Sequence, residues 1–455
     1  MITSIIAAVA IFAILIVVHE AGHFIMAKRL GVRVLRFSIG YPPRVWGIRR
    51  GETDYSLGAT PLGGYVKMLG DEVAEDPSVE TIRSYLTELR LDLIGAAKAS
   101  GWLRDNASSG DQALQRIAGE LVAPTSESLA GARAVELLGR APEADEMILL
   151  REIDRAGSVT RAIESLAEAR PSALLERFRE RAFPSQRLLK RIAIVLAGPL
   201  ANILFAPLLM TVVFMVGVPT MLPVLGTIKQ DLPGYAAGLR PGDHILSING
   251  VQTETWDDLS SAVKRSNGQR LDLVVRRPQA TGLVTFHLVV QPKLLPEQTV
   301  YGNKTPTWVI GVMPRGDEKS RRVAPLPAIR DGVVETGRMS VSLFIGIAKI
   351  INGTTPARQA LGGPIMIAQM AGREAHQGFA DVALFMVMLS LELGIINLLP
   401  VPLLDGGHLL FFIIEGIRGK PLQLRHREIA MQVGLFLLVI LMVFVILNDI
   451  SRIIG

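Results

Sequence analysis

The sequence of 455 residues contains no cysteine. Disulfide bonds and thiolate metal sites are therefore excluded, and any metal ion must be held by histidine and carboxylate side chains. Charged residues are also scarce, at 20% of the chain, whereas apolar residues make up 49%. This apolar balance excludes an ordinary soluble enzyme and predicts an integral membrane protein.

The chain also lacks any stretch in which clustered lysine and arginine alternate with aromatic residues, although its formal net charge is +6. The basic excess is better explained by cytoplasmic charges that flank membrane spans, and we expect no nucleic-acid partner. The N-terminal apolar run has neither a basic n-region nor an evident small-residue cleavage site. We therefore expect it to be retained as a span rather than removed as a signal peptide.

Four apolar stretches have the length that a helix needs to cross about 30 Å of hydrocarbon. They lie at about 3–27, 191–218, 381–399 and 430–447. Basic residues cluster after the first stretch, before the second and between the last two, which places those loops in the cytoplasm and both termini outside. The apolar piece Met339–Ile351 is too short to span and is predicted to be an amphipathic or interfacial helix.

The pattern His19-Glu20-Ala21-Gly22-His23 lies inside the first apolar run. Residues four apart in a helix share a face, so His19 and His23 can present two imidazole nitrogens to one metal ion. Glu20 projects about a third of a turn away, where it can take a proton from water at the metal without being a ligand. Ionisable groups in an apolar stretch are costly unless paired, hydrated or metal-bound, which favours a metal site over a juxtamembrane polar cluster.

A third ligand is needed, because catalytic zinc sites normally use three protein ligands and keep the fourth position for water or substrate. Asp405 follows an apolar span that is broken by Pro400 and Pro402, and this break would expose backbone and aim a carboxylate into the helix bundle. His408 is a competing ligand three residues further on.

The segments between the first two spans change in character. Residues 31–72 alternate apolar and polar side chains and predict a β-hairpin, either lining a wet cavity at membrane depth or forming a small cytoplasmic hairpin away from the site. Residues 73–184 are rich in alanine, leucine, glutamate and arginine with helical periodicity. They predict a cytoplasmic helical insertion, which either binds a partner or serves as a passive spacer.

After the second span, residues 222–294 resemble a bacterial PDZ domain. The resemblance rests on a first strand, the turns AAGL and PGD, a strand that ends at Asn249-Gly250, and a helix that carries Leu259 and Val263. Such a domain can bind a peptide by strand addition, or it can simply shield the membrane site. The expected peptide groove lies beside Leu225, Gly226, Thr227 and Ile228.

Three motifs, together with the PDZ segment, resemble the site-2 protease family of intramembrane zinc metalloproteases. They are HEAGHF in the first span, AGPLAN at 197–202 and NLLPVPLLDGGH around the third span. The resemblance is to the bacterial branch of the regulator of sigma-E protease type, which cleaves anti-sigma factors. This chain departs from well-known members of that branch in showing one PDZ segment rather than two and in carrying the helical insertion.

The resemblance implies one Zn²⁺ ion per chain, with His19, His23 and Asp405 as ligands and Glu20 as the base. It implies that Asn397 positions substrate or stabilises an intermediate, although an asparagine near a proline can instead satisfy freed backbone groups. The residues that it implies for substrate binding are Gly63, Gly64, Tyr65, Val66, Asn397, Pro400 and Pro402.

The expected fold class is a polytopic α-helical membrane protein with about four transmembrane helices, a membrane-associated β element, a cytoplasmic α-helical insertion and an extracytoplasmic PDZ domain of α+β type. The expected parts are a first span with HExxH (1–30), a re-entrant β-hairpin (31–72), the insertion (73–184), a second span (190–218), the PDZ domain (222–294), a strand and amphipathic-helix linker (295–380), a third span (381–403), a cytoplasmic loop (404–429) and a fourth span (430–448).

The expected function is hydrolysis of a peptide bond in or near the transmembrane segment of single-span proteins of the anti-sigma-factor type, or of remnant signal peptides, as the second cut of regulated intramembrane proteolysis. The expected location is the bacterial inner membrane, with membrane lipid and an unidentified protein at the insertion as further partners. Two alternatives are an inactive PDZ-bearing membrane scaffold and a metal transporter. The intact HExxH and Asp405 disfavour the scaffold, and the lack of a further polar line across the bilayer disfavours the transporter.

Overall fold

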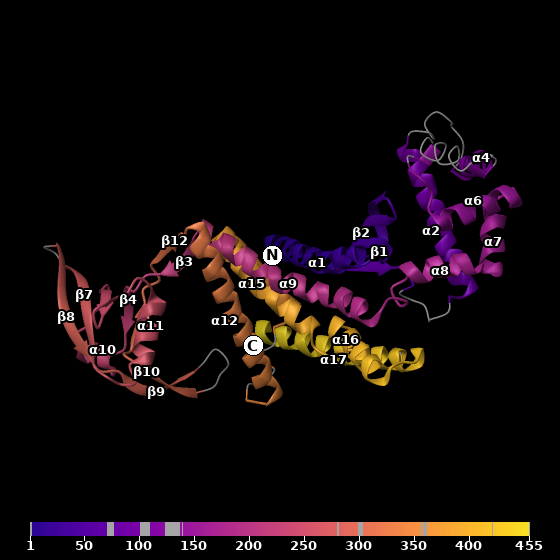
Figure 1. Ribbon diagram of the computed structural model, residues 1–455. Coiled ribbons are helices and arrows are strands. Elements are labelled where there is room, and N and C mark those ends of the chain that lie inside the picture. The colour runs from indigo at the N-terminus through magenta and orange to yellow at the C-terminus, as the bar shows by residue number, and fades with distance from the viewer. Residues whose placement is uncertain are drawn as a thin grey trace. The chain divides into compact units, whose positions relative to one another are not determined.

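Four helices among the described residues are long and apolar enough to cross a membrane, as the sequence predicts. They are α1 (Ile2–Arg29), α9 (Leu188–Val216), α15 (Phe379–Asn397) and α17 (Leu424–Ile454) (Figure 1). The computed structural model describes residues 2–70, 77–100, 110–122, 137–138, 140–279, 282–298, 304–354, 356, 358, 362–420 and 422–454. The chain divides into two compact units. The first unit comprises residues 8–204 and 390–439, and the second comprises residues 1–7, 205–389 and 440–455.

In the first unit, α1 is followed by two long antiparallel strands, β1 (Val34–Arg50) and β2 (Thr53–Met68). The first half of β1 pairs with both halves of β2, so that Phe37 faces Tyr55 on one side and Val66 on the other. The last part of β2, from Gly64 to Met68, has β1 on one side and no strand on the other within the part of the chain that the structure describes. The predicted β element is therefore present, and this segment of β2 is an open edge.

The helical insertion consists of α2 (Val79–Ala99), α4 (Gly110–Val122), α6 (Ala144–Ala156), α7 (Val159–Ala169) and α8 (Ser172–Arg181). These helices share one apolar core, in which Leu86, Leu114 and Leu149 are fully buried. In the described part of this segment, the helices agree with the helical periodicity of the sequence. Within the expected range 73–184, residues 73–76, 101–109, 123–136 and 139 lie outside the described residues.

Arginine–carboxylate pairs fasten the β1–β2 hairpin to the helical insertion. The buried guanidinium of Arg33 pairs with Asp92 of α2. Arg49 binds the same carboxylate at 2.6 Å and Glu88 at 2.8 Å. Near the hairpin turn, Glu52 accepts from Arg181 at the end of α8. Because Arg33 is only 1% exposed, its charge depends on this pairing, and the hairpin and the insertion are held as one piece.

The second unit contains a four-stranded antiparallel sheet in the order β6-β5-β7-β8. Its strands are β5 (His244–Ile248), β6 (Val251–Gln252), β7 (Leu271–Gln279) and β8 (Gly282–Val290). Strands β7 and β8 of this sheet lie side by side in Figure 1. The helices α10 (Pro233–Ala236) and α11 (Trp256–Arg265) belong to the same unit, and Leu259 and Val263 of α11 enter its core. These elements follow the order expected of the PDZ segment.

The packed core of this part extends beyond the expected boundary at residue 294. Strands β9 (Lys293–Gln298) and β10 (Lys304–Val309) pair with each other, β11 (Val312–Pro314) pairs with β4 (Leu225–Ile228), and β12 (Glu318–Arg321) pairs with β3 (Val218–Met221). Ile310 lies in the same core as Leu225. Part of the expected linker therefore completes this fold.

Three further helices complete the described chain. Helix α12 (Pro325–Ile351) begins well before the predicted start at Met339, and it is not among the candidate spans. Helix α14 (Pro364–Gln377) is capped by Asp449 of α17, whose carboxylate accepts from the backbone nitrogens of Gly363, Ile365 and Met366 at 3.0–3.1 Å. Helix α16 (Asp405–Arg418) follows the proline-broken end of α15.

Candidate metal centre

Three potential ligand atoms meet in the first unit. His19 and His23 lie one turn apart in α1, and their Nε2 atoms are 3.2 Å apart. The Asp405 Oδ2 atom lies 3.0 Å from His19 Nε2 and 3.4 Å from His23 Nε2. Both histidines are 8% exposed. The structure thus brings together the three residues expected as ligands, although they come from opposite parts of the sequence.

The spacing of these atoms fits a single zinc ion. Zinc bonds of about 2.0–2.1 Å in tetrahedral geometry place the ligand atoms about 3.3 Å from one another. The three observed separations, 3.0, 3.2 and 3.4 Å, bracket that value. Two imidazole nitrogens and one carboxylate oxygen form a donor set that suits zinc, and three ligands leave a fourth position for water or substrate.

The competing ligand, His408, lies in the wall of the same pocket but does not belong to the ligand cluster of the described residues. Asp405 Oδ2 instead lies 3.0 Å and 3.4 Å from the two histidine Nε2 atoms, so Asp405 is the carboxylate placed to face a cation here.

The backbone around Asp405 explains how the carboxylate is aimed. Helix α15 ends at Asn397, and Asp405 is the first residue of α16. The intervening turn folds back on the start of α16: a Cβ on Gly406 would lie 2.1 Å from Leu399 O, and one on Gly407 would lie 2.3 Å from Val401 O. Only glycine fits at these two positions, so the DGG sequence brings the ligand-bearing helix start against its own turn.

Two glycines let α1 and α9 cross in contact at the histidines. A Cβ on Gly22 would lie 2.3 Å from Ala197 O, and one on Gly198 would lie 2.1 Å from His23 Nε2. Small residues at such crossings allow the helix backbones to approach closely. His23 Nδ1 lies 2.9 Å from Ile194 O, so that this ring nitrogen donates to the carbonyl and Nε2 is left free to bind metal.

Gly198 and Asn202 of α9 were not among the residues expected at the site. Asn202 is fully buried, and its side chain lies 3.4 Å from His19 Nδ1. The available signal was the AGPLAN motif itself, in which Gly198 and Asn202 stand four residues apart and so share one face of α9. The structure shows that this face contacts the two histidines.

The expected base and the expected substrate strand lie together. Glu20 faces the same pocket as His19, His23 and Asp405. A Cβ on Gly64 would lie 2.9 Å from Glu20 Cγ and 2.8 Å from Ile16 Cγ2, so β2 packs directly against this face of α1. The open edge of β2 therefore passes beside the base.

A cavity of about 560 Å³ surrounds the ligand cluster. Of the residues expected to bind substrate, Gly63, Gly64, Tyr65, Val66 and Asn397 line this cavity. The two prolines at 400 and 402 do not line it. They belong to the turn before α16, and the adjacent Leu403 and Leu404 line the cavity instead.

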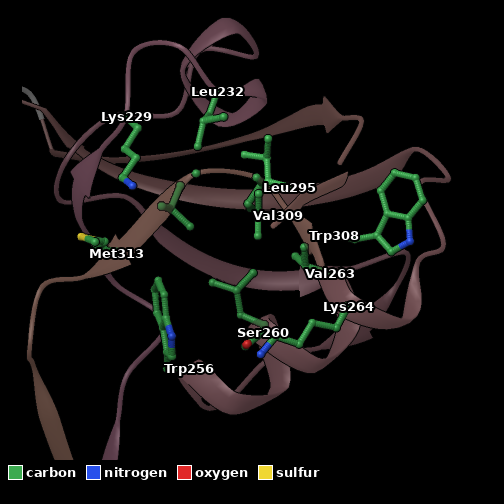
Figure 2. Close-up of a pocket in the computed structure, with 14 residues that line it drawn as sticks. Lys229, Leu232, Trp256, Ser260, Val263, Lys264, Leu295, Trp308, Val309 and Met313 are labelled. Atoms are coloured by element: carbon green, nitrogen blue, oxygen red, sulfur yellow. The ribbon is translucent and has the colours of Figure 1, made fainter. Parts of the chain in front are cut away.

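The residues beside which a peptide groove is expected, Leu225–Ile228, form β4. Strand β4 pairs with β11 on one side. On the other side, Leu225 N donates to Asp243 O and Leu225 O accepts from Gly242 N, both at 2.7 Å. A pocket of about 350 Å³ lies elsewhere in this unit, between α11 and the β10–β11 segment. Figure 2 shows Trp256, Val263 and Trp308 in its wall.

The chain matches the family model of peptidase family M50 over residues 7–441. It is 30% identical to the zinc metalloprotease RasP of Geobacillus kaustophilus, over 99% of this chain and 98% of the relative. It is also 30% identical to the regulator of sigma-W protease RasP of Bacillus subtilis, over 99% of each chain. A putative zinc metalloprotease of Agrobacterium fabrum is 29% identical over 98% of this chain and 95% of the relative.

Proposed function

The chain belongs to peptidase family M50, and we propose that it hydrolyses a peptide bond within or near the transmembrane segment of single-span membrane proteins. It is a zinc metalloprotease of the site-2 type. The observation that carries the proposal is the cluster of His19, His23 and Asp405, which lies beside Glu20 and the open edge of β2.

We assign the chemistry to these residues as follows. His19, His23 and Asp405 hold the zinc ion, which when bound polarises the scissile carbonyl and makes water acidic enough to attack at neutral pH. Glu20 takes a proton from the attacking water and returns it to the leaving amine. Asn397, in the wall of the same cavity, positions the substrate or stabilises the developing negative charge.

A peptide bond inside a helix is shielded by the hydrogen bonds of that helix, so the substrate must unwind locally before it can be cut. The open edge from Gly64 to Met68 offers backbone groups that replace those hydrogen bonds by strand addition. The close packing of Gly64 on Glu20 places this edge next to the base. A substrate strand paired with β2 would therefore pass directly along the metal cluster.

The Bacillus subtilis relative is named as a regulator of sigma-W protease. We propose that the substrates of this chain are likewise anti-sigma factors with a single span, or remnant signal peptides, cut in the second step of regulated intramembrane proteolysis. We place the protein in a bacterial inner membrane, with the active site towards the cytoplasm and the segment from β4 to β11 outside as a PDZ domain. This PDZ domain would restrict access to the active site until a first protease has trimmed the substrate. The helical insertion would bind an unidentified cytoplasmic partner.

The test compares the wild type with E20Q and E428Q in detergent, using a tagged single-span substrate and recording the zinc content of each protein. Glu428 is exposed on α17 and belongs to neither the ligand cluster nor its cavity. We expect E20Q to lose cleavage and keep its zinc, and E428Q to keep both. Ordinary turnover by zinc-loaded E20Q would refute the assignment of the base. Full-length wild type that binds zinc but cuts no single-span substrate would instead support an inactive scaffold.

A further inference from the structure

We propose that Asn202 is a positioning residue that fixes the ring of His19 for metal binding through a hydrogen bond to its Nδ1 atom. This inference rests on the proposed function, because it takes His19 as a zinc ligand. It adds a residue of α9 to a site that is otherwise built from α1 and the start of α16. The side chain of Asn202 is 0% exposed and lies 3.4 Å from His19 Nδ1.

As a metal ligand, His19 needs a hydrogen-bond acceptor beside its Nδ1 atom. Its Nε2 atom faces Asp405 Oδ2 at 3.0 Å and His23 Nε2 at 3.2 Å, so Nε2 is the atom that would bind metal. A neutral imidazole that gives its Nε2 lone pair to a metal carries its proton on Nδ1. A buried N–H group without an acceptor costs about 1–3 kcal/mol, so this ligand set needs an acceptor beside Nδ1.

Asn202 can supply that acceptor by a half-turn of its amide. In the structure the amide nitrogen faces His19 Nδ1, and Oδ1 is buried without a hydrogen-bond partner. The oxygen and nitrogen of an amide occupy nearly the same shape, so the hydrogen-bond network decides between them. Turning the amide breaks no hydrogen bond of Oδ1 and brings this oxygen to the ring N–H that metal binding requires.

The position of Asn202 is itself fixed by the neighbouring helix. Ser390 of α15 donates from its hydroxyl to the backbone oxygen of Asn202 at 2.8 Å. A Cβ on Gly394, one turn further along α15, would lie 3.0 Å from Pro199 O and 2.8 Å from Ile203 Cγ1, so the two helices are in close contact here. The backbone from which the Asn202 amide projects is therefore held against α15.

The two histidines are supported differently, and the difference makes the proposal testable. His23 Nδ1 donates to a backbone carbonyl, that of Ile194, which no side-chain substitution removes. His19 depends on a side chain instead. A purely structural asparagine, holding helices together through interhelical hydrogen bonds, would affect folding without a specific effect on metal affinity.

The experiment measures zinc affinity by competition with a chromophoric chelator, in detergent, for the full-length wild type, N202L, N202D and the control T211V. Thr211 lies on the same helix, where its hydroxyl donates to Pro207 O. Loss of an outer-shell partner typically lowers metal affinity about 10–100-fold. We expect a loss of that size in N202L, near wild-type affinity in N202D because its carboxylate still accepts, and no change in T211V. Excess zinc should restore cleavage by N202L.

A second readout is the visible spectrum of the Co²⁺-loaded proteins, which reports ligand geometry independently of activity. We expect it to change in N202L and to stay close to the wild type in T211V. Wild-type zinc affinity in folded N202L would overturn the proposal. If N202L fails to fold, N202A takes its place, because alanine also has no acceptor, and wild-type affinity there would overturn the proposal equally. The underlying ligand assignment fails separately if H19A still binds zinc as tightly as the wild type.

Discussion

Replacing Gly198 with alanine should disable the metal centre while leaving the protein folded. Gly198 lies in α9 at its crossing with α1, and an added Cβ would stand 2.1 Å from His23 Nε2, where ordinary van der Waals contacts begin at 3.4 Å. Either His23 or the helix must therefore move by on the order of 1 Å. Metal–ligand distances tolerate only about 0.2 Å, so the displacement exceeds what the zinc site can absorb.

The expected cost to stability is much smaller than the cost to metal binding. Overpacking a well-packed interior typically costs about 1–3 kcal/mol, and the change from glycine to alanine in a helix returns about 1 kcal/mol of helix propensity. The net loss of roughly 0–2 kcal/mol leaves G198A folded. Zinc affinity should fall by at least about 100-fold, since a ligand is displaced rather than merely its outer partner removed.

The assay measures zinc affinity by chelator competition and cleavage of a single-span substrate, together with the thermal unfolding of each protein. Gly337 of α12 provides the matched control, because a Cβ there meets nothing within 4 Å. We expect G337A to match the wild type in zinc affinity and cleavage. Wild-type zinc affinity and cleavage in G198A would show that α1 and α9 can accommodate a Cβ at their crossing, and that the close approach of Gly198 to His23 does not control metal binding.

Three further results are expected. In G64A, the new Cβ meets Glu20 Cγ at 2.9 Å and should displace this side chain, so cleavage should fall about 10-fold or more at unchanged zinc affinity. Unchanged kinetics would contradict the close packing of Gly64 against the base. D92N leaves the buried Arg33 without its charged partner and should lower the free energy of unfolding by about 3–5 kcal/mol, measured as a lower unfolding temperature. A shift in unfolding temperature no larger than that of the surface variant E80Q would contradict the importance of this ion pair. Deleting residues 222–314 should permit cleavage of untrimmed substrate, and unchanged selectivity in a folded protein would count against a gating role.

The meeting of His19, His23 and Asp405 was predictable because local rules point to each of them. His19 and His23 share a helix face by spacing alone, and Asp405 was marked by the prolines that break an apolar span. The AGPLAN motif puts Gly198 and Asn202 on one face of α9, but it does not say that this face meets α1, and their contacts with the histidines depend on that meeting.

The pairing of β4 with β11 was not predicted, for a related reason. Leu225–Ile228 was expected as a strand, but its partner β11 lies more than 80 residues later, in a stretch expected to be a linker. Pairing between distant strands is set by tertiary packing, not by the pattern of either strand. The early start of α12 at Pro325 was missed because Arg330, Asp331 and Glu335 interrupt its apolar pattern, and a search for long apolar windows passes over such a helix.

The distance in sequence between the three proposed ligands also bears on when the enzyme can first act during its own synthesis. His19 and His23 leave the ribosome early, whereas Asp405 is added only after most of the chain has been made. At about 5–20 residues per second, that interval lasts tens of seconds. A nascent chain that already lies in the membrane among newly inserted proteins therefore carries an incomplete ligand set. The chain should therefore be unable to cleave neighbouring membrane proteins until the third span and the start of α16 are in place. The order of translation would thus delay proteolysis until synthesis is nearly complete.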